Sequence, residues 1–539
     1  AAGLAAAAVA LGVALPAPAG AQPAPAAGNG SARTLPGVVG GELRGGLNQA
    51  VRMAIEKNLD VELIRFDPWI ADTVLGEAWG AYDPEVFGEG GHSNVETPTA
   101  SALLQASVLK QRRWDGDAGL RGLIPWLGGA YEISYGGSEL ETNSSIETLS
   151  PNYGGNFLAS LQIPLLRGLF RSEPWTAVRL APVGGPSSSD QFAADLMDIV
   201  SNTEDAYWNL IAARDGRRVA EKSLETARAL LEQVQAQYEV GVVSKVEVVE
   251  AEAGVADREF RKIETDAVER TARDVFIDTV LGPYLAPRTE IDVELSDPPE
   301  EAPVREVDPE AAVERAFAKR PELQVARRQI EQREVQLQFA SNQRLPQLDV
   351  QASYGNIGLA GEQNRRCGFG GIPCNVRPDL GSSVWDANDD FFSDDAAENF
   401  AVRGVLSIPI GNVRARNQYD RARFEMRRAE IQLRRLEQSI VTEIRRAARN
   451  LIAALEGIEA AERGVAAAEE QLRAERVRLE YGESTPFAVL QREEDLVRAQ
   501  SQLILAQRTY HNAITLLERA QGTILERNAI VIEEVAALR

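Results

Sequence analysis

Residues 412–480 carry the longest helical pattern of the chain, and this pattern limits the fold more than any other feature. Apolar residues recur there at three- or four-residue spacing, and no Gly or Pro interrupts residues 412–456. This spacing places the apolar side chains in one stripe along a helix. A helix of this extent is about 100 Å long at 1.5 Å per residue, so we predict a bundle of long, nearly parallel helices. The stripe comprises Ala429, Leu433, Leu436, Ile440, Ile444, Ala448, Leu451 and Leu455.

Four short sequence landmarks occur twice, in the same order. An Ala-Val-x-x-Ala pattern at 50–54 returns at 312–316. The later landmarks are Pro84 and Pro346, the Ile-Pro pairs at 163–164 and 408–409, and the glycines Gly241 and Gly482. Self-similarity at such a long period indicates an internal duplication of half-molecules. We therefore expect a first structural repeat over 49–283, a connector over 284–310, a second repeat over 311–525 and a C-terminal tail over 526–539. The helical patterns at the start of the repeats predict single helices over about 49–81 and 308–344, and the connector contains one short strand candidate at 290–295.

Alternating apolar and polar residues predict strands between the helices, at about 130–135 and 157–163 in the first repeat and near 345–350 and 400–408 in the second. We count about two principal strands per repeat, or four per chain. Lipid does not tolerate open sheet edges, and a membrane barrel needs at least eight strands. Several copies of the chain must therefore share one barrel, and three copies would give twelve strands. The fold class that we expect is mainly α, with long helices and a membrane β-barrel part. We interpret 117–137 as an outer hairpin, although it could add barrel strands.

Two local features near these strands carry their own expectations. Pro182 and Pro186 fall inside the long helical pattern of the first repeat, so we expect a bulge or loop there. Aromatic residues cluster around the strands, as in a membrane-interface girdle or as ordinary core residues. These residues are Trp79, Tyr82, Trp126, Tyr131, Tyr153, Phe157 and Phe170.

The N-terminal residues 1–21 are apolar and end in a small-x-small sequence, which is typical of a secretory signal peptide. An Ala-rich disordered tail is the alternative, and 22–48 would be an N-terminal segment. No run of 18 apolar residues follows, so the sequence predicts no transmembrane helix. The formal net charge of −23 excludes nucleic acid as a natural partner.

Cys367 and Cys374 are the only cysteines, and they lie close together in a Gly-rich and Asn-rich loop. In an exported protein this arrangement favours a local disulfide, with a metal pair as the alternative. The two histidines, His92 and His511, have no second ligand at a metal spacing. We therefore expect no metal and no cofactor.

Six short segments carry a resemblance to a known family, at 50–58, 163–168, 206–210, 237–251, 408–411 and 481–491. With them the chain resembles the bacterial outer-membrane efflux protein family, the TolC-like channel-tunnels, over about residues 40–525. The resemblance implies a homotrimer with a 12-stranded β-barrel in outer-membrane lipid and a long-helix α-barrel tunnel that extends through the periplasm. An equatorial belt would include 284–310 and 526–539. The resemblance also implies a passive exit duct that docks with a periplasmic adaptor and an inner-membrane pump of the RND or ABC class, in tripartite efflux or type I secretion.

The same resemblance places the two helix-turn-helix tips at the periplasmic entrance and makes them adaptor-docking candidates. Helix capping by the glycines and by Ser244 and Thr485 is the alternative role, and both roles are compatible. The candidate docking residues are Val240, Gly241, Val242, Val243 and Ser244 at one tip, and Gly482, Glu483, Ser484 and Thr485 at the other.

Glu247 and Glu250 are the candidates for an acidic entrance that favours cations, because they occupy the family's acidic position and the next helical turn. A solvated helix face is the alternative. The second repeat departs from the best-known member at Ala488, Gln491 and Ser484, which puts a salt-bridge latch like that member's in doubt.

Two other functions compete with the export duct. A periplasmic or surface coiled-coil scaffold without a pore would explain the helices but would not need the Pro-terminated strands. An exported enzyme would need a nucleophile elbow, a phosphate loop or a metal cluster, and the sequence contains none of these motifs.

Overall fold

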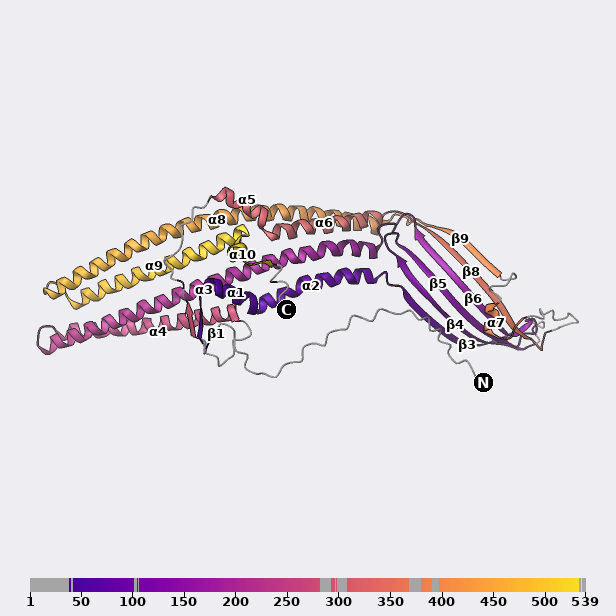
Figure 1. Ribbon diagram of the computed structural model, residues 1–539, viewed down its shortest axis with the longest axis horizontal. Coiled ribbons are helices and arrows are strands. Elements are labelled where there is room, and N and C mark those ends of the chain that lie inside the picture. Colours follow the sequence, from indigo (N-terminus) through magenta and orange to yellow (C-terminus); the bar gives the residue numbers. More distant parts are fainter. Residues whose placement is uncertain are drawn as a thin grey trace.

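The structure is a computed structural model that describes residues 38–39, 42–100, 104, 106–281, 292–295, 297, 308–367, 380–389, 397–532 and 535. Long helices form one end of the elongated molecule and a single broad sheet forms the other, as Figure 1 shows. The expected signal peptide at 1–21 and most of the 22–48 segment lie outside the described residues.

The helices of the two halves follow the same order. In the first half α1 spans Leu47–Lys57, α2 spans Leu59–Gly80, α3 spans Glu173–Glu239 and α4 spans Lys245–Leu281. Their counterparts in the second half are α5 (Pro309–Lys319), α6 (Pro321–Asn342), α8 (Val413–Glu480) and α9 (Pro486–Gln521). Two short helices complete the set, α7 (Val384–Asp389) and α10 (Ile524–Arg527). The long helix predicted over 412–480 is confirmed.

Each half contains a helix break that the sequence pattern did not indicate, since we expected single helices over 49–81 and 308–344. Asn58 separates α1 from α2 with an extended backbone, and its side chain accepts hydrogen bonds from the N–H groups of Asp60 and Val61. Arg320 separates α5 from α6 and precedes Pro321, which disfavours the helical conformation in the residue before it. The two breaks lie at equivalent positions of the two halves.

The predicted loop at Pro182 and Pro186 is wrong, because α3 continues through both prolines. Each proline removes one hydrogen bond from the helical ladder. The neighbours α2 and α6 pack against α3 and hold it on two sides. Ser189 also donates to the carbonyl oxygen of Gly185 at 3.4 Å. Tertiary packing thus outweighs the local cost of the two prolines.

Within the described residues the large sheet contains six strands, where we expected about four and left open that 117–137 could add more. These are β3 (Glu85–Pro98), β4 (Val108–Ile124), β5 (Gly129–Thr142), β6 (Leu149–Pro164), β8 (Gln347–Gln363) and β9 (Ala397–Ser407). They pair in this order, and every pair is antiparallel. The hairpin β4–β5 therefore lies within the sheet, between β3 and β6. Its sequence concealed this placement because charged and glycine residues interrupt the alternation in β4.

A second, small sheet lies beside the helices. It joins β1 (Val38–Val39), β2 (Glu42–Gly45) and β7 (Asp292–Leu295), with β2 and β7 parallel. The short strand predicted at 290–295 in the connector is thereby confirmed over 292–295, and its first two residues lie outside the described ones. Near it, the Asp297 carboxylate accepts hydrogen bonds from the Leu47 N–H at 2.7 Å and from the Tyr207 hydroxyl at 2.8 Å. The connector is thus fixed to α1 and α3.

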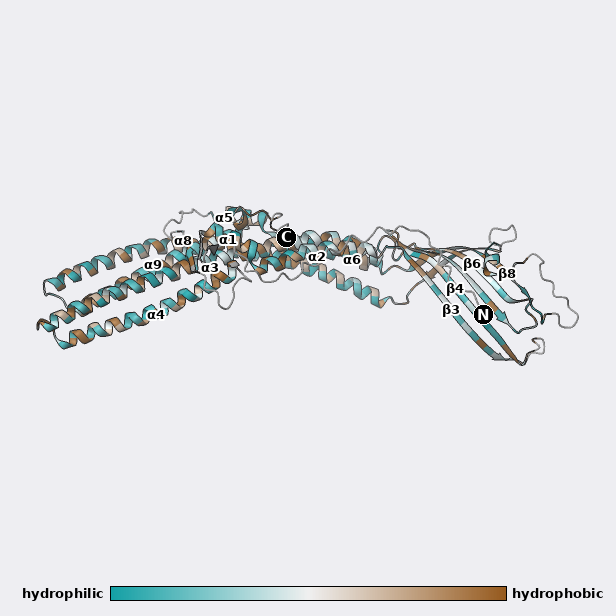
Figure 2. Ribbon diagram, turned by 60° about the horizontal axis from the view of Figure 1, so that its bottom comes forward, coloured by the Kyte–Doolittle hydropathy of each residue, from teal (hydrophilic) through white to brown (hydrophobic). Residues whose placement is uncertain are grey.

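The two faces of the large sheet differ in polarity. We call one the apolar face, and define it by the row of directly opposed residues Val86, Leu120, Ile133, Ala159, Tyr354 and Phe400. We call the other the polar face, and define it by the neighbouring row Glu85, Arg121, Glu132, Ser160, Ser353 and Ala401. Figure 2 shows the mixed hydropathy along these strands.

None of the seven aromatic residues named above is buried: three are exposed, and four, including Tyr82, are half-buried. Tyr131, Tyr153 and Phe157 lie on the apolar face by their register. Trp126 and Phe170 are each 54% exposed and follow the strand ends nearest the helices. Their placement agrees with an interfacial girdle.

Candidate functional site

The first helix-turn-helix tip joins α3 to α4 through Gly241, whose φ is +80°. The N–H of Gly241 donates to the Tyr238 carbonyl and the N–H of Val242 donates to the Gln237 carbonyl, both at 2.9 Å. A left-handed residue at this position lets the last carbonyls of α3 find donors, and glycine adopts it without a steric penalty. The predicted glycine cap is therefore present at this tip.

The second tip, between α8 and α9, has the same geometry. Gly482 has a φ of +75°, and the N–H of Glu483 donates to the Arg478 carbonyl at 2.8 Å. Thr485 caps α9 by accepting a hydrogen bond from the Ala488 N–H at 3.3 Å. The Ser484 hydroxyl is hydrogen-bonded to Glu475 of α8.

Both tips expose large apolar side chains. Val240 and Val242 of the first tip are 75% and 72% exposed, and Tyr481 of the second is 79% exposed. Val246 and Phe487 are exposed one turn further along. Exposed apolar surface at the end of an elongated protein is typical of an interaction site. Sequence reasoning missed Val246, Tyr481 and Phe487, although their position beside the tip segments could have indicated them.

Glu247 and Glu250 have different roles in the first tip. The Glu247 carboxylate accepts hydrogen bonds from the Ser244 hydroxyl at 3.2 Å and from the Ser244 N–H at 3.4 Å. The bond from the Ser244 N–H is the glutamate half of a capping box at the start of α4. Glu250 is exposed one turn further on. Glu247 therefore stabilises the start of α4 whether or not it also lines an entrance.

The two tip hairpins, α3–α4 and α8–α9, also contact each other further along their helices, away from the tips. Arg258 of α4 is largely buried and donates to the Leu490 carbonyl of α9 at 3.1 Å. One turn further, Arg261 donates to the Glu494 carboxylate at 3.2 Å. The hydrogen bond from Arg261, together with nearby arginine charges, lowers the pKa of Glu494 against the opposing effect of burial. These contacts join two hairpins that are more than two hundred residues apart in the chain.

An apolar core lies under these polar contacts and holds all four tip helices together. It contains Ala227, Leu230, Val234, Val248, Ala251, Leu472, Val489 and Leu490. A side chain at Gly254 would meet Leu490 at 3.1 Å, so the hairpins approach closely there. The tip region is therefore one packed unit within this chain.

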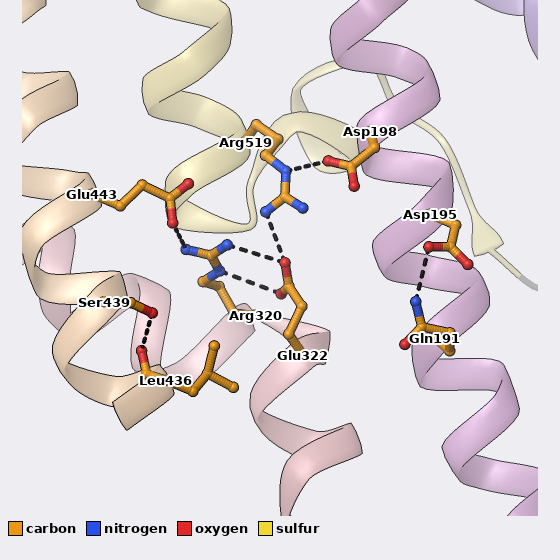
Figure 3. A network of polar contacts seen from close by, with 9 residues as sticks. All are labelled: Gln191, Asp195, Asp198, Arg320, Glu322, Leu436, Ser439, Glu443 and Arg519. Carbon is orange, nitrogen blue, oxygen red and sulfur yellow. Dashed lines mark hydrogen bonds and ion pairs between the residues drawn. The ribbon is translucent and has the colours of Figure 1, made fainter. Parts of the chain in front are cut away.

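A charged network crosses the middle of the molecule, at the break between α5 and α6 (Figure 3). Arg320 is only 5% exposed and donates to Glu322 at 3.0 Å and to Glu443 of α8 at 2.6 Å. Arg519 of α9 donates to the same Glu322 at 2.7 Å and to Asp198 of α3 at 2.5 Å. Burial alone would raise the pKa of Glu322, but Arg320 and Arg519 outweigh it and lower the pKa to about 2.

A second buried polar group lies close to this charged network. Glu204 of α3 is fully buried and accepts hydrogen bonds from Thr515 at 2.5 Å and from Asn528 at 2.8 Å, and it also pairs with Arg527. Its neighbour Asp205 lines a groove of about 720 Å³ between α3, α8 and α9. Burial and the Glu204 charge raise the pKa of Asp205 to about 6. Part of the C-terminal tail is thereby attached to α3.

The polar face of the sheet is hollowed at the end nearest the helices. A cavity of about 610 Å³ lies over it, lined by residues that include Glu85, Arg121, Glu132, Gln351 and Arg403. Arg121 forms a two-pronged hydrogen bond with Glu85 across β3 and β4, at 2.8 and 3.0 Å. The cavity wall is therefore charged and polar.

Cys367 is disulfide-bonded, whereas Cys374 lies outside the described residues. Their pairing therefore remains a prediction. Within the described ranges, no three His, Cys, Asp or Glu side chains are grouped so as to hold a metal ion. Among the described helices, none combines the length and the apolar character needed to cross a membrane.

Paired long helices that end in capped apolar tips, together with an antiparallel sheet that has one apolar and one polar face, are the features of a channel-tunnel. The sequence profile of the outer membrane efflux proteins matches residues 103–269 and 312–523, which is more than half of the chain. The chain therefore belongs to the outer membrane efflux protein family. Its members are transport channels rather than enzymes, and the family resemblance predicted from the sequence is confirmed.

Solved channel structures share this fold. The outer membrane channel CmeC of Campylobacter jejuni superposes with a TM-score of 0.63 at 15% identity, over 91% of this chain and 89% of that one. VceC of Vibrio cholerae gives 0.61 at 17% identity, over 88% and 96% of the two chains. The open state of Neisseria gonorrhoeae MtrE gives 0.60 at 16% identity, over 89% of each. No curated protein matches the chain in sequence.

Proposed function

We propose that this protein is the outer-membrane exit duct of a tripartite efflux or type I secretion system, and that it acts as a homotrimer. Family membership supports a transport channel. The observation that carries the proposal is that one sheet has an apolar face and a polar face. This sheet is joined to helices that are long enough to cross much of a periplasm. Lipid would contact the apolar face, and the transported molecule would pass the polar one.

The opposite end of the molecule is the proposed docking site for a periplasmic adaptor, which couples the duct to an inner-membrane pump of the RND or ABC class. The exposed residues Val240, Val242 and Tyr481 support this proposal because they give each tip an apolar surface without a partner in this chain. The capped backbone holds that surface rigidly. An adaptor with apolar residues at its own end would fit it.

Glu247 and Glu250 are proposed to line the entrance and to favour cations. Three copies would place six carboxylates at one level of the tunnel. Glutamine also serves at the third helical position of a capping box, so Glu247→Gln removes the charge while it preserves the start of α4. The charge can therefore be tested separately from the fold.

Single-channel conductance in planar bilayers tests this proposal, with the wild type compared with the Glu247→Gln/Glu250→Gln variant. We expect a cation-selective current whose selectivity falls in the variant. The matched control is Glu462→Gln/Glu469→Gln, which removes two exposed carboxylates of α8 away from the tip. Equal selectivity in all three proteins would reject the entrance role, and a water-soluble protein that never inserts would reject the duct.

A scaffold without a pore is the alternative that the long helices alone would support. It gives no role to a six-stranded sheet with opposed apolar and polar faces. Extraction from membranes separates the two functions, because a duct needs detergent whereas a periplasmic scaffold is released by salt or osmotic shock.

A further inference from the structure

We infer that the membrane barrel of this protein has eighteen strands, because each of three copies contributes all six strands of its large sheet. This inference rests on the proposed duct and trimer. It differs from the twelve strands that the family resemblance implied, and the difference lies in the hairpin β4–β5. That hairpin would be part of the barrel wall rather than a loop outside the membrane.

The side chains of β4 and β5 alternate in the same register as those of their neighbours. Leu120, Ile133 and Tyr135 lie on the apolar face, in rows that continue through Ala159 and Phe157 of β6. Between these rows, the polar face of the hairpin carries charged or small residues, namely Asp117, Gly119, Arg121, Glu132, Ser134 and Gly136. A hairpin that lies in water does not need this alternation, whereas every strand of a membrane barrel does.

The apolar stretch of β4 has the length of a membrane crossing. Its outward residues between Trp114 and Ile124 carry no charge, and 11 residues tilted by about 45° span roughly 25 Å. Beyond Trp114 the same face becomes charged, with ion pairs between Arg112 and Glu141 at 3.0 Å and between Lys110 and Glu96 at 3.1 Å. These pairs mark where the strands leave the lipid.

The two edges of the sheet are complementary to each other, so a second copy of this chain is the partner that fits them. Within the described part of the chain, β3 and β9 each pair on one side only. Six alternating antiparallel strands make β9 run opposite to β3, so β9 of one copy can pair with β3 of the next in the antiparallel sense. Lipid requires such closure, because unpaired backbone groups are not tolerated there.

The helical part of the molecule has its edges on the same two sides. Below the sheet, α2 packs on α3, α3 on α6 and α6 on α8, so α2 and α8 are the outer helices there. Both expose large apolar side chains, including Phe66 and Ile70 on α2 and Phe424 and Ile431 on α8. A head-to-tail ring of copies would cover these residues along the same interface that closes the barrel.

The additional strands widen the exit. Barrel diameter grows roughly linearly with strand number, so eighteen strands give about 1.5 times the diameter and about twice the cross-section of twelve. The hairpin also brings Arg113, Asp115, Asp117, Arg121 and Glu132 to the polar wall. The outer-membrane segment would therefore admit bulkier cargo than the tips, and cargo size would be limited at the helical end.

Paired cysteine substitutions test whether the hairpin lies in the membrane. Ala118→Cys and Ile133→Cys place a thiol on the apolar face, whereas Arg121→Cys and Glu132→Cys place one on the polar face. The matched controls on β6 are Ala159→Cys and Ser160→Cys, one on each face. Reaction with a water-soluble maleimide in liposomes gives the accessibility. The native Cys367 is disulfide-bonded and does not react.

We expect polar-face thiols of β4 and β5 to react at least tenfold faster than apolar-face thiols, as on β6. Similar rates on both faces of β4 and β5, with alternation retained on β6, would overturn the eighteen-stranded barrel and leave the duct intact. Loss of alternation on β6 as well would overturn the proposed duct itself. Native mass spectrometry then counts the copies: three copies give eighteen strands, whereas two would give twelve and reject the inference.

Discussion

The guanidinium of Arg261 on α4 lies 3.2 Å from the Glu494 carboxylate on α9, and this ion pair joins the two tip hairpins of one chain. Arg261 also pairs with Asp257 on its own helix at 3.1 Å. Loss of the Glu494 carboxylate therefore leaves Arg261 paired with Asp257, so that no unpaired charge results. The sequence analysis put in doubt a salt-bridge latch at the tips themselves. The Arg261–Glu494 pair lies elsewhere, several helical turns away from the tip glycines.

Glu494→Gln is expected to loosen the contact between the hairpins and to increase the open probability of the channel. Both side chains are about two-fifths exposed, so the pair contributes at most about 1 kcal/mol, or roughly fivefold in an open–closed equilibrium. Single-channel recordings of the purified protein measure this shift. Glu259→Gln is the control, because its partner Arg228 belongs to the same hairpin. An equal shift in both variants would assign the effect to general charge loss.

The Glu322 carboxylate is expected to make the protein sensitive to acid. Its pKa falls from 4.5 to about 2 in the folded protein, so the folded state binds fewer protons than the unfolded state between these values. The stabilisation is complete above pH 4.5 and is lost as the pH falls towards 2. This pKa shift contributes at most about 3 kcal/mol to the free energy of unfolding.

Denaturant unfolding at pH 7 and at pH 3 measures this effect, with wild type compared with Glu322→Gln. The variant should be less stable at pH 7 and should lose less stability than wild type on acidification. Glu462→Gln, in an exposed position of α8, serves as the control and should follow the wild type at both pH values. A parallel pH dependence in wild type and Glu322→Gln would contradict the assignment.

The long helices and their ends could be predicted from the sequence because these features are local. The apolar stripe of residues 412–480 and the glycines at 241 and 482 encode α8 and both tips through periodicity and backbone conformation. The polar contacts above the tips could not be predicted in this way. Arg258 and Leu490 are far apart in the sequence, and nothing local specifies that they meet.

The sheet shows where local patterns are insufficient. β4 contains Arg112, Arg113, Asp115 and Asp117, so its alternation between faces is visible only once its partners are known. Strand register depends on long-range pairing, whereas a helical stripe is complete within one segment. The sequence therefore indicated the long helices correctly but too few strands, and the internal duplication stays a prediction. The residues proposed for docking and for the entrance remain predictions.

Asp205→Asn is expected to stabilise the folded protein above pH 6. Burial and the neighbouring Glu204 raise the pKa of Asp205 to about 6, so the folded state binds more protons than the unfolded state between pH 3.8 and 6, and stability falls as the pH rises through this range. Asparagine removes the charge, and we expect a gain of about 1–2 kcal/mol at pH 8. Unfolding experiments at pH 8 and pH 4 check this, and an equal gain at both pH values would contradict a titrating group.

The exposed apolar side chains of the tips provide the last prediction. Val242→Asp and Tyr481→Asp each replace an apolar side chain that is more than 70% exposed, so the fold should lose at most about 0.5 kcal/mol. If the tips bind an adaptor, either charge should weaken that binding at least tenfold, because a carboxylate would be desolvated in an apolar contact. Co-purification with the cognate adaptor measures binding, and conductance of the isolated protein shows that the channel is intact. Asn450→Asp, on α8 far from the tips, is the control. Unchanged adaptor binding in both tip variants would move the docking site away from the tips.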